Sequence, residues 1–317
     1  SRSGGSSLHD GRGRRFEHTI HVVAELRAAL VVHPTVAAAE LLRTLFRDTQ
    51  GTLWMGTNAG AWQLRRGVFS RLPLPKPPST AVTVITSASR GGVWLGYDNW
   101  LHRWDGRTAT PLEISPSQPV KVITQAHTDS SGRLWLAYDL GKIGVVDVHG
   151  VFRPVDSRES LANGTQPFFE DRDHIIWAAG HAGISRITDG RVATLTRENG
   201  LPASRVWSIV EDDDGYLWLS VDRGLVRVRR DELAKAATTP SHRIQYKLYD
   251  TSDGLAGAPL GNIRSARGSD GHLWFVRGGG LTEVNPTLLG PHEVPSSAPV
   301  RIEAVVANEQ RLTPDPL

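Results

Sequence analysis

The sequence predicts an all-β protein built from tandem copies of one unit, and two observations carry that prediction. Each copy holds a short apolar run flanked by turn-forming residues, and 32 glycines and 19 prolines suit many short strands and turns. A strand-containing repeat of about 40 residues is typical of a β-propeller, in which each repeat forms one blade. Six tryptophans mark the repeat, with gaps of 40, 41, 42, 41 and 56 residues: Trp54, Trp94, Trp135, Trp177, Trp218 and Trp274.

Each copy contains a predicted hairpin turn ahead of the tryptophan. Aspartate at the first corner of a turn and glycine at the fourth favour a type I turn, which we expect to join the first and second strands of a blade. The fourth copy has His174 in place of the glycine. The aspartates stand six positions before the tryptophan and the glycines three positions before it: Asp48, Asp129, Asp171 and Asp212, and Gly51, Gly91, Gly132, Gly215 and Gly271.

The tryptophan belongs to a second strand that we expect to be buried on both faces. The residue before it is always aliphatic, and neighbouring residues on a strand point to opposite faces. We therefore assign the six tryptophans to core packing between blades and not to a ligand site. A second tight turn, leading into the third strand, is predicted by glycines six positions after the tryptophan: Gly60, Gly141, Gly183, Gly224 and Gly280.

The two ends of the chain leave the number of blades open. We expect a flexible tail over residues 1–16, a propeller over 17–298, and over 299–317 a C-terminal strand or the start of a truncated Ig-like domain. An N-terminal strand near 16–20 would complete the sixth blade or build a seventh with the C-terminal end. We favour seven blades of four antiparallel strands, with six as the alternative. Extra residues around 231–242 are interpreted as an insertion on an outer strand or loop.

Composition excludes several classes of function. The net charge is only +3 and the basic residues are spread along the chain, so we expect no nucleic-acid partner. Without cysteine there is no disulfide, no thiolate nucleophile and no cysteine metal site. The sequence contains no stretch of about 18 apolar residues, so we expect no membrane span. We interpret the chain as a mature or excised fragment.

Motifs of common catalytic sites are missing from the sequence. The twelve histidines show no HExxH spacing, and no G-x-S-x-G motif occurs. The acidic run at 211–214 falls on a predicted hairpin turn and lacks EF-hand spacing. We therefore predict no catalytic residue, no metal and no cofactor in this chain.

The segment Asp48–Gly60 follows the pattern D-x-x-G-x-L-W-x-G-T-x-x-G, which resembles the two-component regulator propeller repeat. The segment Asn199-Gly200-Leu201-Pro202 resembles the lead-in of that repeat, and Asp253-Gly254-Leu255 echoes it one blade later. The copies differ from this pattern at some positions, since Ser220 and Ala137 replace the glycine two positions after the tryptophan. In that family the propeller is the extracytoplasmic sensor of a membrane histidine kinase or a related regulator.

The resemblance implies a non-catalytic, ligand-sensing propeller in the periplasm, with any kinase activity and any membrane contact in domains outside this chain. Family members are implicated in sensing carbohydrate breakdown products, so a small molecule or oligosaccharide is the expected partner. One alternative is a propeller lyase similar to virginiamycin B lyase, because Gly271–Phe275 matches the G-x-L-W-F form of its repeat. The other is a protein-interaction scaffold or a homodimerisation module.

The expected ligand site is the face that carries the turns into the third strands and the loops between blades. Aromatic planes beside carboxylates, amides and guanidinium groups suit sugars or other polar organic ligands. Trp100 is of most interest because it replaces a turn glycine, and a channel-facing His181 beside a carboxylate would favour the lyase alternative. Arg205 and Asn262 are expected at the entry to inner strands, lining the channel. The candidates on the face are Asn58, Tyr97, Asp98, Asn99, Trp100, Tyr138, Asp139, His181, Asp222, Arg223 and Arg277.

Overall fold

A computed structural model describes most of the chain after residue 41. The described residues are 42–74, 81–89, 91–97, 100–112, 123–138, 141–155, 165–188, 190–202, 205–255, 257–259, 265–268, 270–278, 280–289, 305–307 and 310–312.

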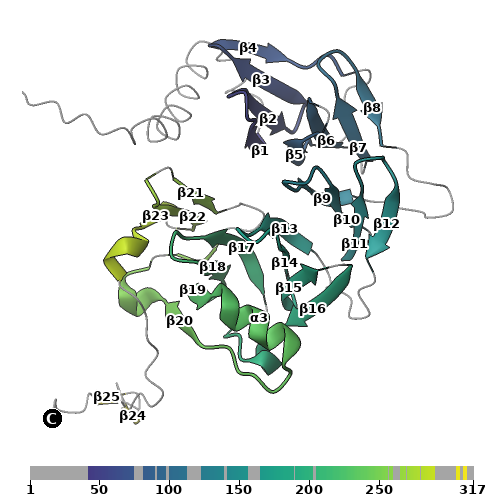
Figure 1. The fold of residues 1–317 in the computed structure, drawn as a ribbon. Coiled ribbons are helices and arrows are strands. Elements are labelled where there is room, and N and C mark those ends of the chain that lie inside the picture. The colour runs from purple at the N-terminus through teal and green to yellow at the C-terminus, as the bar shows by residue number, and fades with distance from the viewer. Residues whose placement is uncertain are drawn as a thin grey trace, which may run out of the picture.

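Six antiparallel sheets follow one another along the chain as the blades of a propeller (Figure 1). In each blade the strands are hydrogen-bonded in sequence order, and the first strand of every blade contacts the first strand of the next. Blades 1 to 3 contain β1 (Leu42–Arg47), β2 (Leu53–Thr57), β3 (Ala61–Arg65) and β4 (Val68–Arg71); β5 (Val84–Ser87), β6 (Val93–Tyr97), β7 (Trp100–Trp104) and β8 (Ala109–Pro111); β9 (Ile123–Thr128), β10 (Leu134–Tyr138), β11 (Lys142–Val146) and β12 (Phe152–Val155).

Blades 4 and 5 also have four strands each, and the described part of blade 6 has three. These blades contain β13 (Thr165–Glu170), β14 (Ile176–Gly180), β15 (Gly183–Thr188) and β16 (Arg191–Leu195); β17 (Val206–Glu211), β18 (Tyr216–Val221), β19 (Gly224–Arg229) and β20 (Tyr246–Tyr249); β21 (Ala266–Arg267), β22 (Leu273–Arg277) and β23 (Gly280–Val284), followed by the 3-10 turn η3 (Pro286–Leu289).

The favoured number of seven blades is wrong, and the alternative of six is confirmed, because the described residues form six blades. The last two strands, β24 (Val305–Ala307) and β25 (Gln310–Leu312), pair with each other in a separate two-stranded sheet. The ends of the chain also lack the aspartate, glycine and tryptophan unit that builds the first two strands of a blade. The strand proposed near residues 16–20 lies outside the described residues, so closure of the ring by that strand stays a prediction.

Both predicted turns form. The glycine three positions before the tryptophan adopts positive φ, for example 79° at Gly215, because the chain must reverse there. His174 adopts the same conformation with φ of 60°, so the turn geometry holds even without glycine. The second turn has a different requirement: a Cβ on Gly183 would lie 2.0 Å from the carbonyl oxygen of Leu195. Glycine therefore lets the third strand start against the end of the fourth.

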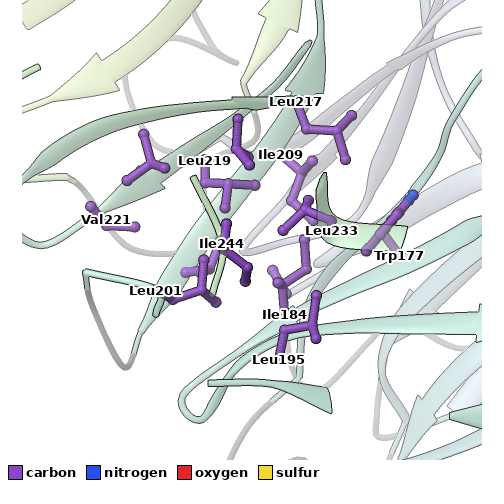
Figure 2. Packing of buried hydrophobic residues seen from close by; sticks show 14 of the residues in the cluster. Trp177, Ile184, Leu195, Leu201, Ile209, Leu217, Leu219, Val221, Leu233 and Ile244 are labelled. Atoms are coloured by element: carbon purple, nitrogen blue, oxygen red, sulfur yellow. The ribbon is translucent and has the colours of Figure 1, made fainter. Parts of the chain in front are cut away.

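The second strands form the core of the blades, as predicted. Strands β2, β10, β14 and β18 are buried along their whole length. Four of the repeat tryptophans are buried, whereas Trp94 and Trp274 are half-buried. Apolar side chains of adjacent blades pack together, and Figure 2 shows Trp177 of β14 in the cluster that also holds Leu217 and Leu219 of β18. Large aromatic burial between blades thus stabilises the ring.

The insertion predicted around residues 231–242 lies between the third and fourth strands of blade 5, and it is a helix. Helix α3 (Arg230–Thr238) buries Leu233 and Ala236 and contacts both β16 and β19. Its sequence is rich in helix-forming Glu, Leu, Ala and Lys, and Asp231 and Glu232 lie in its first turn, where negative charge favours a helix. The helix was missed because nine residues are too few to show a clear period.

Two of the loops between blades share one local structure. The 3-10 turns η1 (Arg197–Asn199) and η2 (Thr251–Asp253) are both capped by side chains, and each ends at a glycine with positive φ, Gly200 and Gly254. These are the two segments that resemble the lead-in of the family repeat. The capped turn defines the direction in which the chain enters the next inner strand, and so positions the residues just before β17.

Candidate functional site

A β-bulge near the start of β17 creates the centre of the candidate site. Val206 pairs with Val221 and Ser208 pairs with Ser220, so Trp207 is an extra residue between the two pairs. A bulge releases its residue from the regular alternation of the strand and re-aims the side chain. The indole Nε1 of Trp207 donates a 2.7 Å hydrogen bond to Oδ1 of Asp222, which follows β18.

His181 and Arg205 complete a four-residue cluster with Trp207 and Asp222. The guanidinium carbon of Arg205 lies 4.5 Å from the centre of the Trp207 ring, which is close enough for a cation–π interaction. The Nη2 of Arg205 lies 2.9 Å from Nδ1 of His181. Because a guanidinium can only donate, Nδ1 accepts this bond and the imidazole carries its proton on Nε2.

Burial and the charge of Arg205 both favour the neutral form of the His181 imidazole. Burial lowers the pKa of His181, and the nearby positive charge of Arg205 lowers it further, while the charge of Asp222 acts in the opposite direction. The cluster therefore presents an N–H donor on His181, a largely exposed carboxylate on Asp222 and the ring of Trp207. These groups suit a polar organic molecule with several hydroxyl groups.

The structure brings together three of the predicted candidates, namely His181, Arg205 and Asp222. They come from the second-to-third-strand turns of blades 4 and 5 and from the loop between these blades. Trp207 was not predicted. Its one signal in the sequence is a large aromatic residue placed directly after Arg205 and Val206 at the start of an inner strand, and only the pairing register shows that it is bulged.

Three other candidates are buried. Tyr97 and Tyr138 belong to apolar clusters, where they stack on His102 and meet Phe152 edge-on, respectively. Arg277 is 3% exposed, and its guanidinium donates to the carbonyl oxygens of Gly257 and Gly224. Burial lowers the pKa of Arg277. The structure thus gives each of these three side chains a packing role within the fold.

The remaining candidates are spread over the face. Trp100 is 47% exposed at the start of β7 in blade 2, two blades from His181. Asn58 and Arg223 are also exposed. The other four candidates lie outside the described residues: Asp98, Asn99, Asp139 and Asn262.

A hollow that was not predicted from the sequence lies among the first strands of blades 3 to 5 and the residue that precedes β21. Its volume is about 290 Å³, at the lower end of small-molecule sites. One of its polar side chains already has hydrogen-bond partners within the protein, because Glu170 accepts hydrogen bonds from the backbone N–H and the hydroxyl of Ser130. The lining residues are His127, Phe168, Phe169, Glu170, Ser208, Ile209 and Ser265.

Only one group of histidine and carboxylate side chains in the described part of the chain has a spacing that suits a metal ion. It consists of Asp270, His272 and Glu283 in blade 6. Among the described helices, none is both long enough and apolar enough to cross a membrane.

Residues 200–223 match the sequence model of the family described as two component regulator propeller. This match confirms the resemblance expected from the sequence for one repeat, and it covers Arg205, Trp207 and Asp222 of the cluster. Comparison with curated proteins finds no match.

Solved structures with the same fold include lyases and sensor domains. A streptogramin B lyase has a TM-score of 0.58 at 20% identity, over 77% of this chain and 78% of that chain. A catalytically inactive virginiamycin B lyase from Staphylococcus aureus, with quinupristin, has a TM-score of 0.58 at 18% identity, over 76% and 79%. The extracellular domain of a putative hybrid two component system from B. thetaiotaomicron has a TM-score of 0.53 at 14% identity, over 78% of this chain and 38% of that chain. At these identities the likeness establishes the propeller fold alone.

Proposed function

We propose that this chain is the ligand-sensing, extracytoplasmic propeller of a bacterial two-component signalling protein. The family match at residues 200–223 supports a signalling role, and the B. thetaiotaomicron domain supports an extracytoplasmic place. A ligand would act by binding one arrangement of the propeller and its neighbouring domains better than another. Any kinase activity and any membrane contact belong to domains outside this chain.

The observation that carries the proposal is the ordered cluster of His181, Arg205, Trp207 and Asp222. Each polar group is already held by a neighbour, so little side-chain freedom is lost when a ligand binds. An aromatic plane beside a carboxylate and N–H donors is the combination that a sugar needs, because sugars present apolar C–H faces and hydroxyl groups. A carbohydrate or a similar polyol is therefore the proposed ligand.

The same geometry favours binding over catalysis. A general base needs an unshared nitrogen lone pair, but Nδ1 of His181 accepts from Arg205 and Nε2 carries the proton. The hydrogen bond from Arg205 therefore prevents His181 from acting as the general base that the lyase alternative would require. The solved lyases share the propeller fold with this chain, and no catalytic pair is carried over from them.

The test is thermal unfolding of the chain against a panel of neutral and acidic oligosaccharides. A ligand that binds only the folded state raises the midpoint by mass action. We expect one sugar class to raise the midpoint of the wild type, and we expect the shift to be lost in Asp222→Asn and Arg205→Gln. The matched control is Arg191→Gln, an exposed arginine on the outer strand β16.

Other outcomes point to the alternatives. A sugar-dependent shift that survives both cluster substitutions would place the ligand elsewhere, with Trp100 as the next site to test. No shift with any sugar, together with a concentration-dependent dimer in solution, would favour the interaction scaffold.

A further inference from the structure

Blade 6 departs from the repeat at three positions that lie close together. Its residue two positions before the tryptophan is His272, where the other blades have Thr52, Gly92, Arg133, Ile175 and Tyr216. The residue paired with the tryptophan is Glu283, whereas other blades have a neutral or basic residue there. The position six before the tryptophan is Gly268 and not aspartate, and the acidic residue of this turn is Asp270.

The strand register explains why the imidazole and the carboxylate meet. Glu283 of β23 lies opposite Trp274 of β22, and His272 is two residues before Trp274. Residues two apart share a face of the strand, so the side chains of His272 and Glu283 are diagonal neighbours on the same face. Nδ1 of His272 lies 2.6 Å from Oε1 of Glu283.

Asp270 is held toward the same point by the turn. The backbone N–H of His272 donates a 3.1 Å hydrogen bond to Oδ1 of Asp270. The other carboxylate oxygen, Oδ2, lies 3.6 Å from Nδ1 of His272. One donor atom from each of the three side chains lies within 4.8 Å of the others.

We propose that Asp270, His272 and Glu283 bind one divalent transition-metal ion, with Zn²⁺ as the preferred ion. Nitrogen and oxygen ligands of Zn²⁺ lie about 2.0–2.2 Å from the ion, which places neighbouring ligand atoms roughly 3–3.6 Å apart. The distances from Nδ1 of His272 to the carboxylate oxygens of Glu283 and Asp270 are 2.6 and 3.6 Å, on either side of most of this range. The side chain of Glu283 is exposed, so it can move to the distance that the ion requires. Magnesium and calcium prefer all-oxygen ligand sets, so the imidazole selects against them.

The ion would join β23 to the hairpin that precedes β22. Three protein ligands leave a fourth position for water or for a group from another molecule. The site is at the turn from first to second strand, on the opposite edge of the blade from the second-to-third-strand turn. It is therefore separate from the cluster around Trp207, and the proposal does not depend on the sugar ligand.

The experiment measures Zn²⁺ binding to the whole chain after dialysis against a chelator. We expect one equivalent of Zn²⁺ to bind and to raise the thermal midpoint, whereas Mg²⁺ at the same concentration leaves the midpoint unchanged. His272→Ala and Glu283→Gln should each weaken binding by about tenfold or more, since even indirect changes at metal sites cost that much. Glu283→Gln keeps the size of an exposed side chain, so it tests the site even if His272→Ala fails to fold.

The matched control is His242→Ala. Nε2 of His242 lies 2.8 Å from Oε2 of Glu232, so these two residues form a histidine–carboxylate pair. Unlike His272, His242 does not belong to a group of three possible metal ligands among the described residues. This variant should bind Zn²⁺ as the wild type does. Zn²⁺ binding that is equal in the wild type and in Glu283→Gln would overturn the proposal, and so would the absence of any saturable binding, which would leave the three residues as an ion pair only.

Discussion

The indole Nε1 of Trp218 donates a 2.8 Å hydrogen bond to Oδ2 of Asp212, six residues earlier in the chain. The other oxygen of the same carboxylate accepts the backbone N–H groups of Asp214 and Tyr216. One aspartate therefore caps the hairpin turn and fixes the tryptophan of the second strand. The same pair recurs in blades 1, 3 and 4 as Asp48–Trp54, Asp129–Trp135 and Asp171–Trp177.

The first prediction concerns this aspartate. Asp212→Ala leaves two buried donors and one partly buried donor without an acceptor, and it removes the charge next to the buried Arg227. We expect the free energy of unfolding to fall by about 3 kcal/mol or more, measured by denaturant titration. Asp214→Ala, in the same turn but exposed, should change it by no more than about 0.5 kcal/mol. Equal losses in the two variants would contradict the role given to Asp212.

The second prediction separates two kinds of turn glycine. Gly215 has positive φ, but a Cβ there would meet nothing within 4 Å, so Gly215→Ala should cost only the conformational strain of about 1 kcal/mol. Gly183→Ala adds a clash with the carbonyl oxygen of Leu195 and should cost about 3 kcal/mol. The order of the two unfolding free energies is the critical result, and a reversed order would refute this account of the second turn.

The third prediction concerns the pH dependence that His181 contributes. Its folded-state pKa is lowered from 6.5, so between the two pKa values the unfolded chain binds more protons than the folded chain. The stability contribution is therefore complete above pH 6.5 and is lost as the pH falls through that window. NMR titration of the imidazole should show the lowered pKa, and Arg205→Gln should move it back toward 6.5. If the titration midpoint of His181 is the same in Arg205→Gln as in the wild type, Arg205 is excluded as a cause of the lowered pKa.

The fourth prediction compares a core tryptophan with a surface one. Trp177 is fully buried between blades, so Trp177→Ala should lower the free energy of unfolding by about 4 kcal/mol. Trp100 is 47% exposed, so Trp100→Ala should lower it by less than about 1 kcal/mol. A large loss from Trp100→Ala would indicate that this residue packs within the fold and is not available to a ligand.

Much of the fold could be predicted because its information is local. The turn residues Asp212 and Gly215 are three apart, and Trp218 follows within the same hairpin. Six copies of the tryptophan strand, each preceded by one or both of these turn residues, therefore predict six inner hairpins. The preference for seven blades over six was wrong because it depended on the ends of the chain, which lack the unit. The helix α3 was missed because its nine residues are stabilised by contacts with β16 and β19 rather than by their own pattern.

The candidate site could be predicted only in part. The repeat placed His181 and Asp222 in equivalent turns of adjacent blades, but Trp207 joins them through a bulge that depends on how β17 pairs with β18. Tyr97 and Arg277 were expected on the same face because they occupy equivalent positions at the ends of second strands. The structure buries Tyr97 in an apolar cluster with blade 1 and buries Arg277 against backbone carbonyl groups.

The sequence by itself determined the propeller class, the two recurrent turns and the buried second strand, because each of these depends on residues a few positions apart. Only the tertiary structure decided which side chains converge, as Arg205 does on His181 and His272 does on Glu283. Such meetings depend on strand register and on the packing of one blade against the next, and neither is encoded in the spacing of residues within a single repeat.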